Sequence, residues 1–380
     1  MSIVLRVIVV LLAGLLAACS STPADPEPGP LPKLPAERLR LERLWQVQVG
    51  EGLGGQVVRL QPAIGAQQVV AASHDGRLLA VDRASGKTLW RLRTGLPLAG
   101  GPALGYGLVV VGSTKGSLHV HDAATGAPRW QAALGAAVLA VPVVTADAVV
   151  ALSADGVVHV FERADGQPRW TYRTPVPPLS LRGSPAPLVV DGVVLVPTPG
   201  GKVVALDLAS GVVTWEVRVA GNTGRSELER MVDLQGDLLL GSNGDLYAAG
   251  FQSQLTALDV QAGRRRWQYD LSTVNSPAEG QGSVYVSDTG STVLAVDAAS
   301  GKLVWRQAEL AWRGLSAPVV LGDAVVLGDA DGWLHLLAQS DGRVLGRERG
   351  RRAALQRLEV QGDTLYAWTR DGNLSAWRLR

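Results

Sequence analysis

The sequence predicts an all-β fold: an eight-bladed β-propeller with four antiparallel strands per blade, closed by pairing of its N-terminal and C-terminal strands. Two observations predict this class. A unit of about 40 residues recurs along the chain, and short β-branched runs alternate with Asp-Gly turns. The composition agrees, because 45 glycines suit tight turns and 47% hydrophobic residues can fill a large core. The formal net charge of +2 is too small to indicate a nucleic-acid-binding protein.

The repeat is marked by an acidic residue, a glycine four residues later and a tryptophan four residues after that. We expect the tryptophan to fill the wedge between neighbouring sheets and its indole N–H to find an acceptor there. The glycine is expected to take the left-handed conformation in the turn before the outer strand. In a seventh copy, Ala338 replaces the acidic residue, Gly342 keeps the glycine and Gly346 replaces the tryptophan. An eighth copy begins at Gly372. The six complete copies are Asp82-Gly86-Trp90, Asp122-Gly126-Trp130, Glu162-Gly166-Trp170, Asp207-Gly211-Trp215, Asp259-Gly263-Trp267 and Asp297-Gly301-Trp305.

Each unit is expected to contain four strands, which in the third unit are residues 138–144, 148–153, 157–162 and 167–173. The eighth unit stops before its own tryptophan. Residues 44–49 look like an isolated outer strand with Trp45 in place. We expect this strand to complete the eighth blade, which would close the ring and remove exposed strand edges. The propeller domain is therefore predicted over 44–380.

The N-terminus has the features of an exported lipoprotein. Residues 1–18 carry one charge, at Arg6, followed by an apolar stretch with a small-residue end, and are predicted to be a signal peptide. The sequence Leu16-Ala17-Ala18-Cys19 resembles a bacterial lipobox, so Cys19, the only cysteine of the chain, is the predicted lipidation site. The alternative is an ordinary signal peptide with a chance cysteine.

Residues 19–43 are predicted to be the acylated cysteine followed by a proline-rich tether. Six prolines lie between Pro23 and Pro35, and such tracts stay extended. We therefore expect this segment to hold the folded domain off the bilayer. Ser20 follows the cysteine where an aspartate would signal inner-membrane retention, so the segment resembles one sorted to the outer membrane, lipid-anchored and facing the periplasm.

Two consecutive repeats are longer than the others. Glu162 to Asp207 spans 45 residues and Asp207 to Asp259 spans 52, whereas most intervals are 38 to 41. Both insertions fall in links from an outer strand to the next inner strand, so they should be neighbours on one face. The alternative is that they are tolerated surface loops, with their leucines tucked against the blades. The candidate partner-binding residues are Leu179, Ser180, Leu181 and Arg182 in the first link and Glu227, Glu229, Arg230 and Asp233 in the second.

Other apparent sites are explained by the repeat. His119, His159 and His335 occupy one repeat position in three separate blades, and no third ligand accompanies the pair His119 and His121. Gly86-Lys87-Thr88 is a blade turn rather than a phosphate loop. The run Arg264–Arg266 is interpreted as a solvated edge. We predict no metal, no cofactor and no catalytic residue.

The lipobox, the proline-rich tether, the eight repeats and the segment Leu179-Ser180-Leu181-Arg182-Gly183 together resemble the BamB family, the propeller lipoproteins of the outer-membrane β-barrel assembly complex. The resemblance implies a non-enzymatic scaffold that binds periplasmic domains of the central barrel subunit and helps outer-membrane proteins fold and insert. Unfolded outer-membrane proteins are a further candidate partner. Residues 226–230 resemble the family's neighbouring acidic loop, whereas Met231, Val232 and Gln235 depart from it.

The repeat also resembles the eight-bladed dehydrogenases that use pyrroloquinoline quinone. Those enzymes stack the quinone on a vicinal disulfide and bind calcium beside an aspartate base. A chain with one cysteine cannot form that disulfide, so a non-enzymatic propeller is favoured. A quinone-dependent periplasmic dehydrogenase remains the alternative, and a propeller that binds envelope polysaccharide or another lipoprotein is a third candidate.

Overall fold

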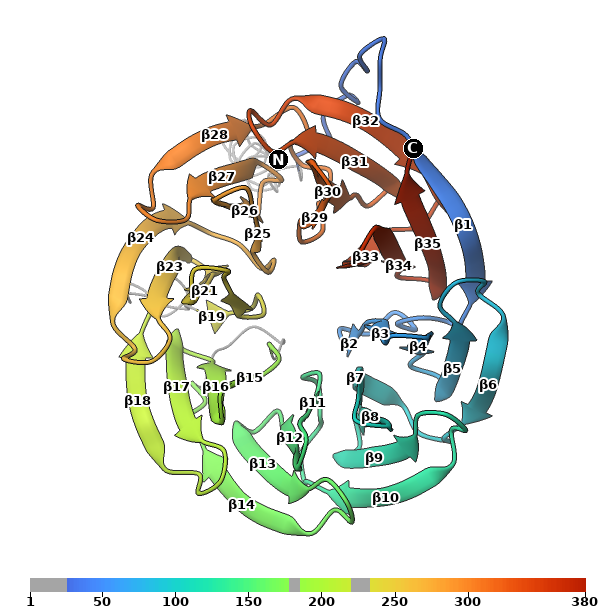
Figure 1. The fold of residues 1–380 in the computed structure, drawn as a ribbon, viewed down its shortest axis with the longest axis vertical. Helices are drawn as coiled ribbons and strands as arrows, with labels where there is room; N and C mark the ends of the chain where they lie inside the picture. Colours follow the sequence, from blue (N-terminus) through green and yellow to red (C-terminus); the bar gives the residue numbers. More distant parts are fainter. Residues whose placement is uncertain (1–25, 178–184, 220–232) are drawn as a thin grey trace, which may run out of the picture.

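Eight sheets, each built on four antiparallel strands, are arranged as blades around a central axis (Figure 1). The computed structural model describes residues 26–177, 185–219 and 233–380. Within these ranges the regular elements are all strands, as predicted. None of the described residues belongs to a helix long and apolar enough to cross a membrane.

The first four blades follow one another along the chain, each running from an inner to an outer strand. Blade one comprises β3 (Ala63–Ile64), β4 (Gln68–Ala72), β5 (Arg77–Asp82) and β6 (Thr88–Arg93). Blade two comprises β7 (Leu98–Gly105), β8 (Leu108–Ser113), β9 (Ser117–Asp122) and β10 (Pro128–Ala133), with β2 (Arg59–Leu60) parallel to β7. Blade three comprises β11 (Val143–Val144), β12 (Ala148–Leu152), β13 (Val157–Glu162) and β14 (Pro168–Arg173), and blade four comprises β15 (Leu188–Val190), β16 (Val193–Thr198), β17 (Lys202–Asp207) and β18 (Val213–Arg218).

The other four blades complete the ring. Blade five comprises β20 (Leu239–Leu240), β21 (Asp245–Ala248), β23 (Ser253–Asp259) and β24 (Arg265–Leu271), beside a small sheet of β19 (Asp233–Leu234) and β22 (Gly250–Phe251). Blade six comprises β25 (Ala278–Gly280), β26 (Ser283–Ser287), β27 (Val293–Asp297) and β28 (Leu303–Gln307). Blade seven comprises β29 (Val319–Leu321), β30 (Ala324–Gly328), β31 (Trp333–Ala338) and β32 (Val344–Arg349), and blade eight comprises β33 (Leu355–Gln361), β34 (Thr364–Thr369), β35 (Asn373–Leu379) and β1 (Leu41–Gln48).

The ring closes through blade eight, as the sequence predicts. Strand β1 pairs antiparallel with β35, in a register that runs from Leu41 opposite Leu379 to Gln48 opposite Asn373. The strand begins three residues before the predicted start at Leu44. Because the two ends of the chain share one sheet, unfolding either end opens the ring.

The tryptophan of each complete repeat seals the junction with the next blade. The Trp90 indole N–H donates to the Ala123 carbonyl at 2.9 Å, and its ring lies over Gly126. A Cβ on Gly126 would lie 2.9 Å from Trp90 Cε3, and its φ of +74° is left-handed. Trp45 and Trp305 make the same indole bond to the neighbouring blade, at 3.0 and 2.8 Å. Glycine is required here for both its conformation and its lack of a side chain.

The seventh repeat keeps its turn but not its tryptophan. Gly342 is left-handed and receives Trp305, whereas Gly346 stands where the next tryptophan would lie. Blade eight has no turn between its third and outer strands, because these are opposite ends of the chain. A tryptophan on β32 would therefore have no glycine turn to cover. The backbone of Leu39 occupies the space beside Gly346 instead.

The core lies between the blades, so the second and third strands of each blade are covered on both faces. Val109, Val110 and Val111 are all completely buried, and so are Val149 and Val150. This explains why these strands read as continuous apolar runs rather than as alternating patterns.

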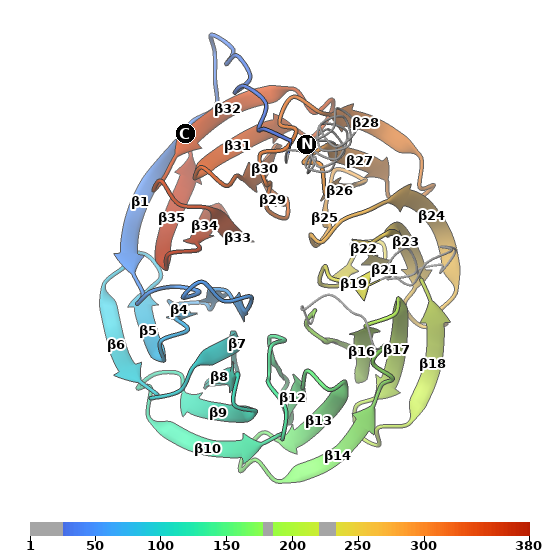
Figure 2. The same ribbon diagram turned by 180° about the vertical axis from the view of Figure 1, so that it is seen from behind.

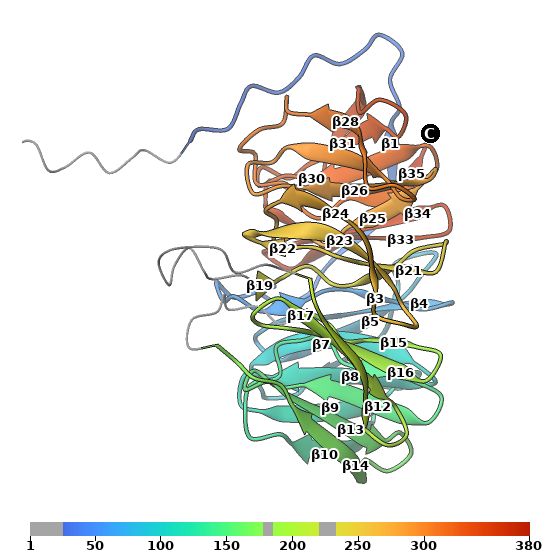
Figure 3. The same cartoon turned by 90° about the vertical axis from the view of Figure 1, so that its left-hand side faces the viewer.

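The N-terminal segment differs from the expected spacer. Residues 26–40 cross the rim at blade seven and leave on the face that carries β19 (Figures 2 and 3). The Leu39 N–H donates to the Leu345 carbonyl at 3.0 Å, Arg347 Nη1 donates to the Pro32 carbonyl at 3.2 Å, and the Gly29 N–H donates to the Ala311 carbonyl at 3.1 Å. A proline-rich segment lacks internal hydrogen bonds. The part from Gly29 to Leu39 instead makes hydrogen bonds with blade seven and the link before it, so it is docked on the propeller.

Candidate interaction surface

Most of the predicted contact residues lie outside the described residues. These are Leu179, Ser180, Leu181, Arg182, Glu227, Glu229 and Arg230, together with the predicted lipidation site Cys19. Asp233 is described. It lies in β19 and is 1% exposed, so its side chain is not presented at the surface. A direct partner contact through that side chain would require β19 to move.

The described ends of the two long links are neighbours. The Ala186 N–H, at the end of the first link, donates to Asp237 Oδ1, at the end of the second, at 2.9 Å. A β-bridge between Pro199 and Asp233 joins blade four to β19. The described ends of the two links therefore lie side by side. We call the face of the ring that carries β19, and on which the N-terminal segment leaves, the link face (Figure 3).

Asp237 also connects these links to strands on the other side of the central axis. Arg59, in β2, donates from Nη1 to Asp237 Oδ1 at 2.7 Å and from Nη2 to the Gln235 carbonyl. Arg357, in β33 of blade eight, donates from Nη1 to Asp237 Oδ2 at 3.0 Å. The Asp237 N–H donates to Ser276 Oγ at 2.9 Å. We call Arg59, Asp237 and Arg357 the axial clasp.

The electrostatics of the axial clasp favour the charged carboxylate. Burial opposes ionisation of Asp237, but Arg59 and Arg357 outweigh it and hold the pKa of that carboxyl below its usual value. Burial likewise opposes the charge of Arg357, while Glu359, 2.8 Å from its Nε, and Asp237 raise its pKa above the ordinary value. The side chains are only 15 to 23% exposed, so removing one partner would leave a poorly solvated charge.

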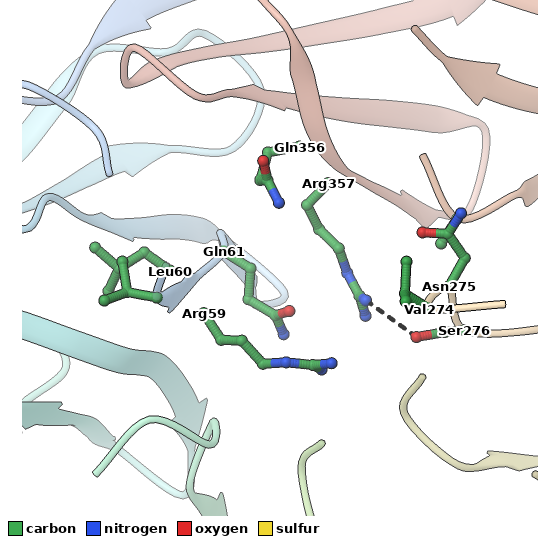
Figure 4. Close-up of a pocket in the computed structure, with 10 residues that line it drawn as sticks. Arg59, Leu60, Gln61, Val274, Asn275, Ser276, Gln356 and Arg357 are labelled. Atoms are coloured by element: carbon green, nitrogen blue, oxygen red, sulfur yellow. Dashed lines mark hydrogen bonds between the residues drawn. The ribbon is translucent and has the colours of Figure 1, made fainter. Parts of the chain in front are cut away.

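A pocket of about 120 Å³ lies beside the axial clasp. Figure 4 shows the side chains of Arg59 and Arg357 converging from two different strands, with Arg357 bonded to Ser276 at 3.4 Å. The lining is polar, but both guanidinium groups already have carboxylate partners. Small-molecule pockets usually enclose about 300 Å³ or more. The arrangement is suited to bracing the ring rather than to holding a cofactor.

The histidines have local partners in separate blades, as the repeat predicts. His119 lies 3.0 Å from Ser117 Oγ, His159 lies 3.2 Å from Ser153 Oγ, and His335 lies 3.0 Å from Asp329 Oδ2. Among the described residues there is no group of three or more His, Cys, Asp or Glu that could hold a metal ion.

Sequence patterns do not reveal the axial clasp or the docked N-terminal segment. Arg59 and Asp237 are 178 residues apart, and Asp237 and Arg357 are 120 apart. No local spacing connects them. The available signal was indirect: Asp237 lies at the end of the longest link, where a charged residue precedes an inner strand.

Comparisons with known proteins agree with this architecture. A family model described as "Outer membrane protein assembly factor BamB" matches residues 37–97, 74–307 and 277–380. The chain is 50% identical over 366 residues to the protein of that name from Alkalilimnicola ehrlichii, covering 96% of this chain and 94% of the relative. It is 48% identical over 345 residues to that of Pseudomonas aeruginosa, covering 90% of each.

A solved structure shows the same arrangement of blades. The crystal structure of BamB from Moraxella catarrhalis matches with a TM-score of 0.82 at 29% identity, covering 89% of this chain and 100% of that one. Sequence, repeat and ring thus agree over nearly the whole length, and the chain belongs to the BamB family of outer membrane protein assembly factors.

Proposed function

We propose that this chain is a non-enzymatic scaffold of the outer-membrane β-barrel assembly complex. In this proposal its two long links bind periplasmic domains of the central barrel subunit, and the complex helps outer-membrane proteins fold and insert. The observation that carries the proposal is the contact between Ala186 and Asp237, which brings the ends of the two longest links together. The names of the curated relatives support the assembly role.

The axial clasp supplies a fixed base for such a surface. A contact made by long links costs less entropy when their ends are already held. Asp237 holds both links while Arg59 and Arg357 hold Asp237, so the base is tied to β2 and blade eight. Apolar side chains next to an arginine are suited to a protein contact in which a few residues supply most of the binding energy. The proposed contact residues are Leu179, Ser180, Leu181 and Arg182, with Glu227, Glu229 and Arg230 beside them.

The test is a triple substitution in the first link. Changing Leu179, Leu181 and Arg182 to alanine should abolish co-purification with the central barrel subunit and leave the thermal unfolding midpoint nearly unchanged. The control is Val212→Ala, since Val212 is 63% exposed in a turn on the opposite face. Co-purification that survives the triple substitution would refute the site.

Acylation at Cys19 is the proposed means of attachment to the outer membrane, with the propeller facing the periplasm. Growth with radioactive palmitate should label the wild-type chain. The Cys19→Ser variant should lose the label and move from the membrane fraction to the soluble periplasm. Label that persists in the variant would place the modification elsewhere.

The absence of catalysis is part of the same proposal. The single cysteine, and an axial pocket of about 120 Å³, are not suited to the quinone chemistry that other eight-bladed propellers support. Purified protein incubated with pyrroloquinoline quinone and calcium should retain no chromophore after gel filtration. A retained quinone spectrum would favour the dehydrogenase.

A further inference from the structure

We propose that the link face at blade seven lies against anionic phospholipid headgroups, beside the point where the N-terminal segment leaves the propeller. The surface consists of Trp312, Arg349, Arg351 and Arg352, which we call the exit patch. The inference rests on the proposed acylation at Cys19, and it adds which side of the ring meets the membrane and what recognises it.

The docking of the N-terminal segment limits how far the acylated cysteine can lie from the propeller. Docking begins at Gly29, whose N–H bonds to the Ala311 carbonyl. Gly29 lies ten positions after Cys19, which is at most about 35 Å of extended chain. A tether leaving from Leu41 would span 22 residues and about 75 Å. The docked segment therefore halves the reach and keeps blade seven within about 35 Å of the acylated residue.

Arg313 shows that the segment occupies a built site. This side chain is 6% exposed, and its Nη1 donates to the Gly29 carbonyl at 3.0 Å. Its Nε bonds to Asp329 Oδ2 at 2.8 Å and its Nη2 to Asp331 Oδ2 at 2.7 Å. A buried guanidinium requires such partners, and one of them is the backbone of the N-terminal segment. The exit point is therefore defined by blade seven itself.

The exit patch lies beside this point, next to Ala311 and Asp331, which contact Gly29 and Arg313. Trp312 follows Ala311 and is 49% exposed, held in a left-handed conformation by a bond from its N–H to the Gly290 carbonyl at 2.9 Å. Arg349 bonds to the Asp331 carbonyl at 3.2 Å and stacks on Trp333. Arg351 and Arg352 follow in the link to blade eight and are both exposed. All of these positions lie in, or at the start of, a link from an outer strand to the next inner strand.

The chemistry of the exit patch matches a charged bilayer surface. Residues 347–352, at the end of β32 and in the link after it, contain four arginines and one glutamate, a local charge of +3 within a chain whose net charge is only +2. Part of this charge is paired, since Arg351 lies 2.6 Å from Asp371. Exposed tryptophan is favoured at membrane–water interfaces, and basic residues beside an acyl chain add a second membrane signal. An arginine-and-tryptophan surface next to a lipid anchor fits anionic headgroups.

Vesicle binding by a chain without acyl groups tests the patch. Mature Cys19→Ala protein should co-sediment with vesicles of phosphatidylcholine and phosphatidylglycerol, less so as salt rises, and not with phosphatidylcholine alone. The variant Trp312→Ala with Arg349→Ala and Arg352→Ala should bind at least about tenfold more weakly. The control, Arg264→Ala with Arg265→Ala, removes two exposed arginines at blade five and should bind as wild type.

Hydrogen exchange tests the docking separately. The Gly29 and Leu39 amides should be protected in the intact protein and lose protection in Gly346→Val, because a Cβ there meets the Leu39 backbone. The lipid contact would be overturned if the protein bound neutral vesicles as tightly as anionic ones, or if the triple variant bound anionic vesicles as tightly as wild type. Unprotected Gly29 and Leu39 amides in the wild type would overturn the docking. Neither assay contains acyl groups or the barrel subunit, so failure of the proposed function leaves both results unchanged.

Discussion

The junction between blades one and two and the junction between blades seven and eight are built from different parts of the chain. At the first, Trp90 covers Gly126 and bonds to Ala123. At the second, β32 carries Gly346, and Leu39 of the N-terminal segment lies beside it, bonded to Leu345. The repeat tryptophan is thus half of a two-blade contact. Where the next blade lacks the receiving turn, the tryptophan is lost and another segment fills the space.

Trp90→Ala should have the largest effect in this comparison. Trp90 is 9% exposed and holds two blades together, so its removal should lower the free energy of unfolding by about 3–5 kcal/mol. Urea denaturation measures the change. Trp312→Ala, at an exposed position outside the repeat, should cost less than about 1 kcal/mol. Equal losses would show that the repeat tryptophan has no special role at the junction.

Asp237→Ala should cause the second-largest loss of stability, because it breaks a contact that no blade repeat supplies. It leaves Arg59 and Arg357 facing each other and should cost about 3 kcal/mol. The pKa of Asp237 is held below its usual value, so its stabilisation is present above about pH 4 and is lost as pH falls further. The difference between wild type and variant, measured by denaturation, should shrink below pH 4. A difference that is constant with pH would rule out the ionic origin.

His335, completely buried in β31 of blade seven, should give a smaller, pH-dependent effect. Burial lowers the pKa of His335 below 6.5, although Asp329 at 3.0 Å opposes the shift. The unfolded chain then binds the proton more readily than the folded one. The free energy of unfolding is therefore highest above about pH 6.5 and falls as pH drops toward the lowered pKa. In His335→Gln this decline should be reduced in denaturation curves taken between pH 7 and about pH 5. An unchanged slope would assign the decline to other groups.

Among the substitutions that break a packed contact, Gly346→Val should have the smallest effect on global stability. It displaces the N-terminal segment from β32 without touching a tryptophan junction, and should cost about 1 kcal/mol. The matched change Gly126→Val meets the Trp90 ring at a left-handed position and should cost several times more. Thermal unfolding of the two variants side by side measures the contrast. Similar losses would mean that the docked segment is as essential to the ring as the tryptophan contact.

Much of the fold could be predicted because its signals are local. The acidic residue, the glycine and the tryptophan of each repeat lie within eight positions of one another. Each strand is short and flanked by turn residues, so the four strands of a blade follow from one stretch of chain. The predicted inner strand at 138–144 is only Val143–Val144 in the structure, since the preceding residues belong to the link. The buried position of Asp233 could not be predicted, because it depends on the pairing of β19 with β22.

The sequence by itself determined the number of blades, the closure through Trp45 and the two longest links, because spacing along the chain is enough to read them. Only the tertiary structure decided that Asp237 meets Arg59 and Arg357, and that residues 29–39 lie on blade seven. Those contacts join residues more than 100 positions apart, and a ring must close before such residues can meet. Periodicity predicts what each blade is made of. The contacts across the axis and over the rim depend on how the blades are placed.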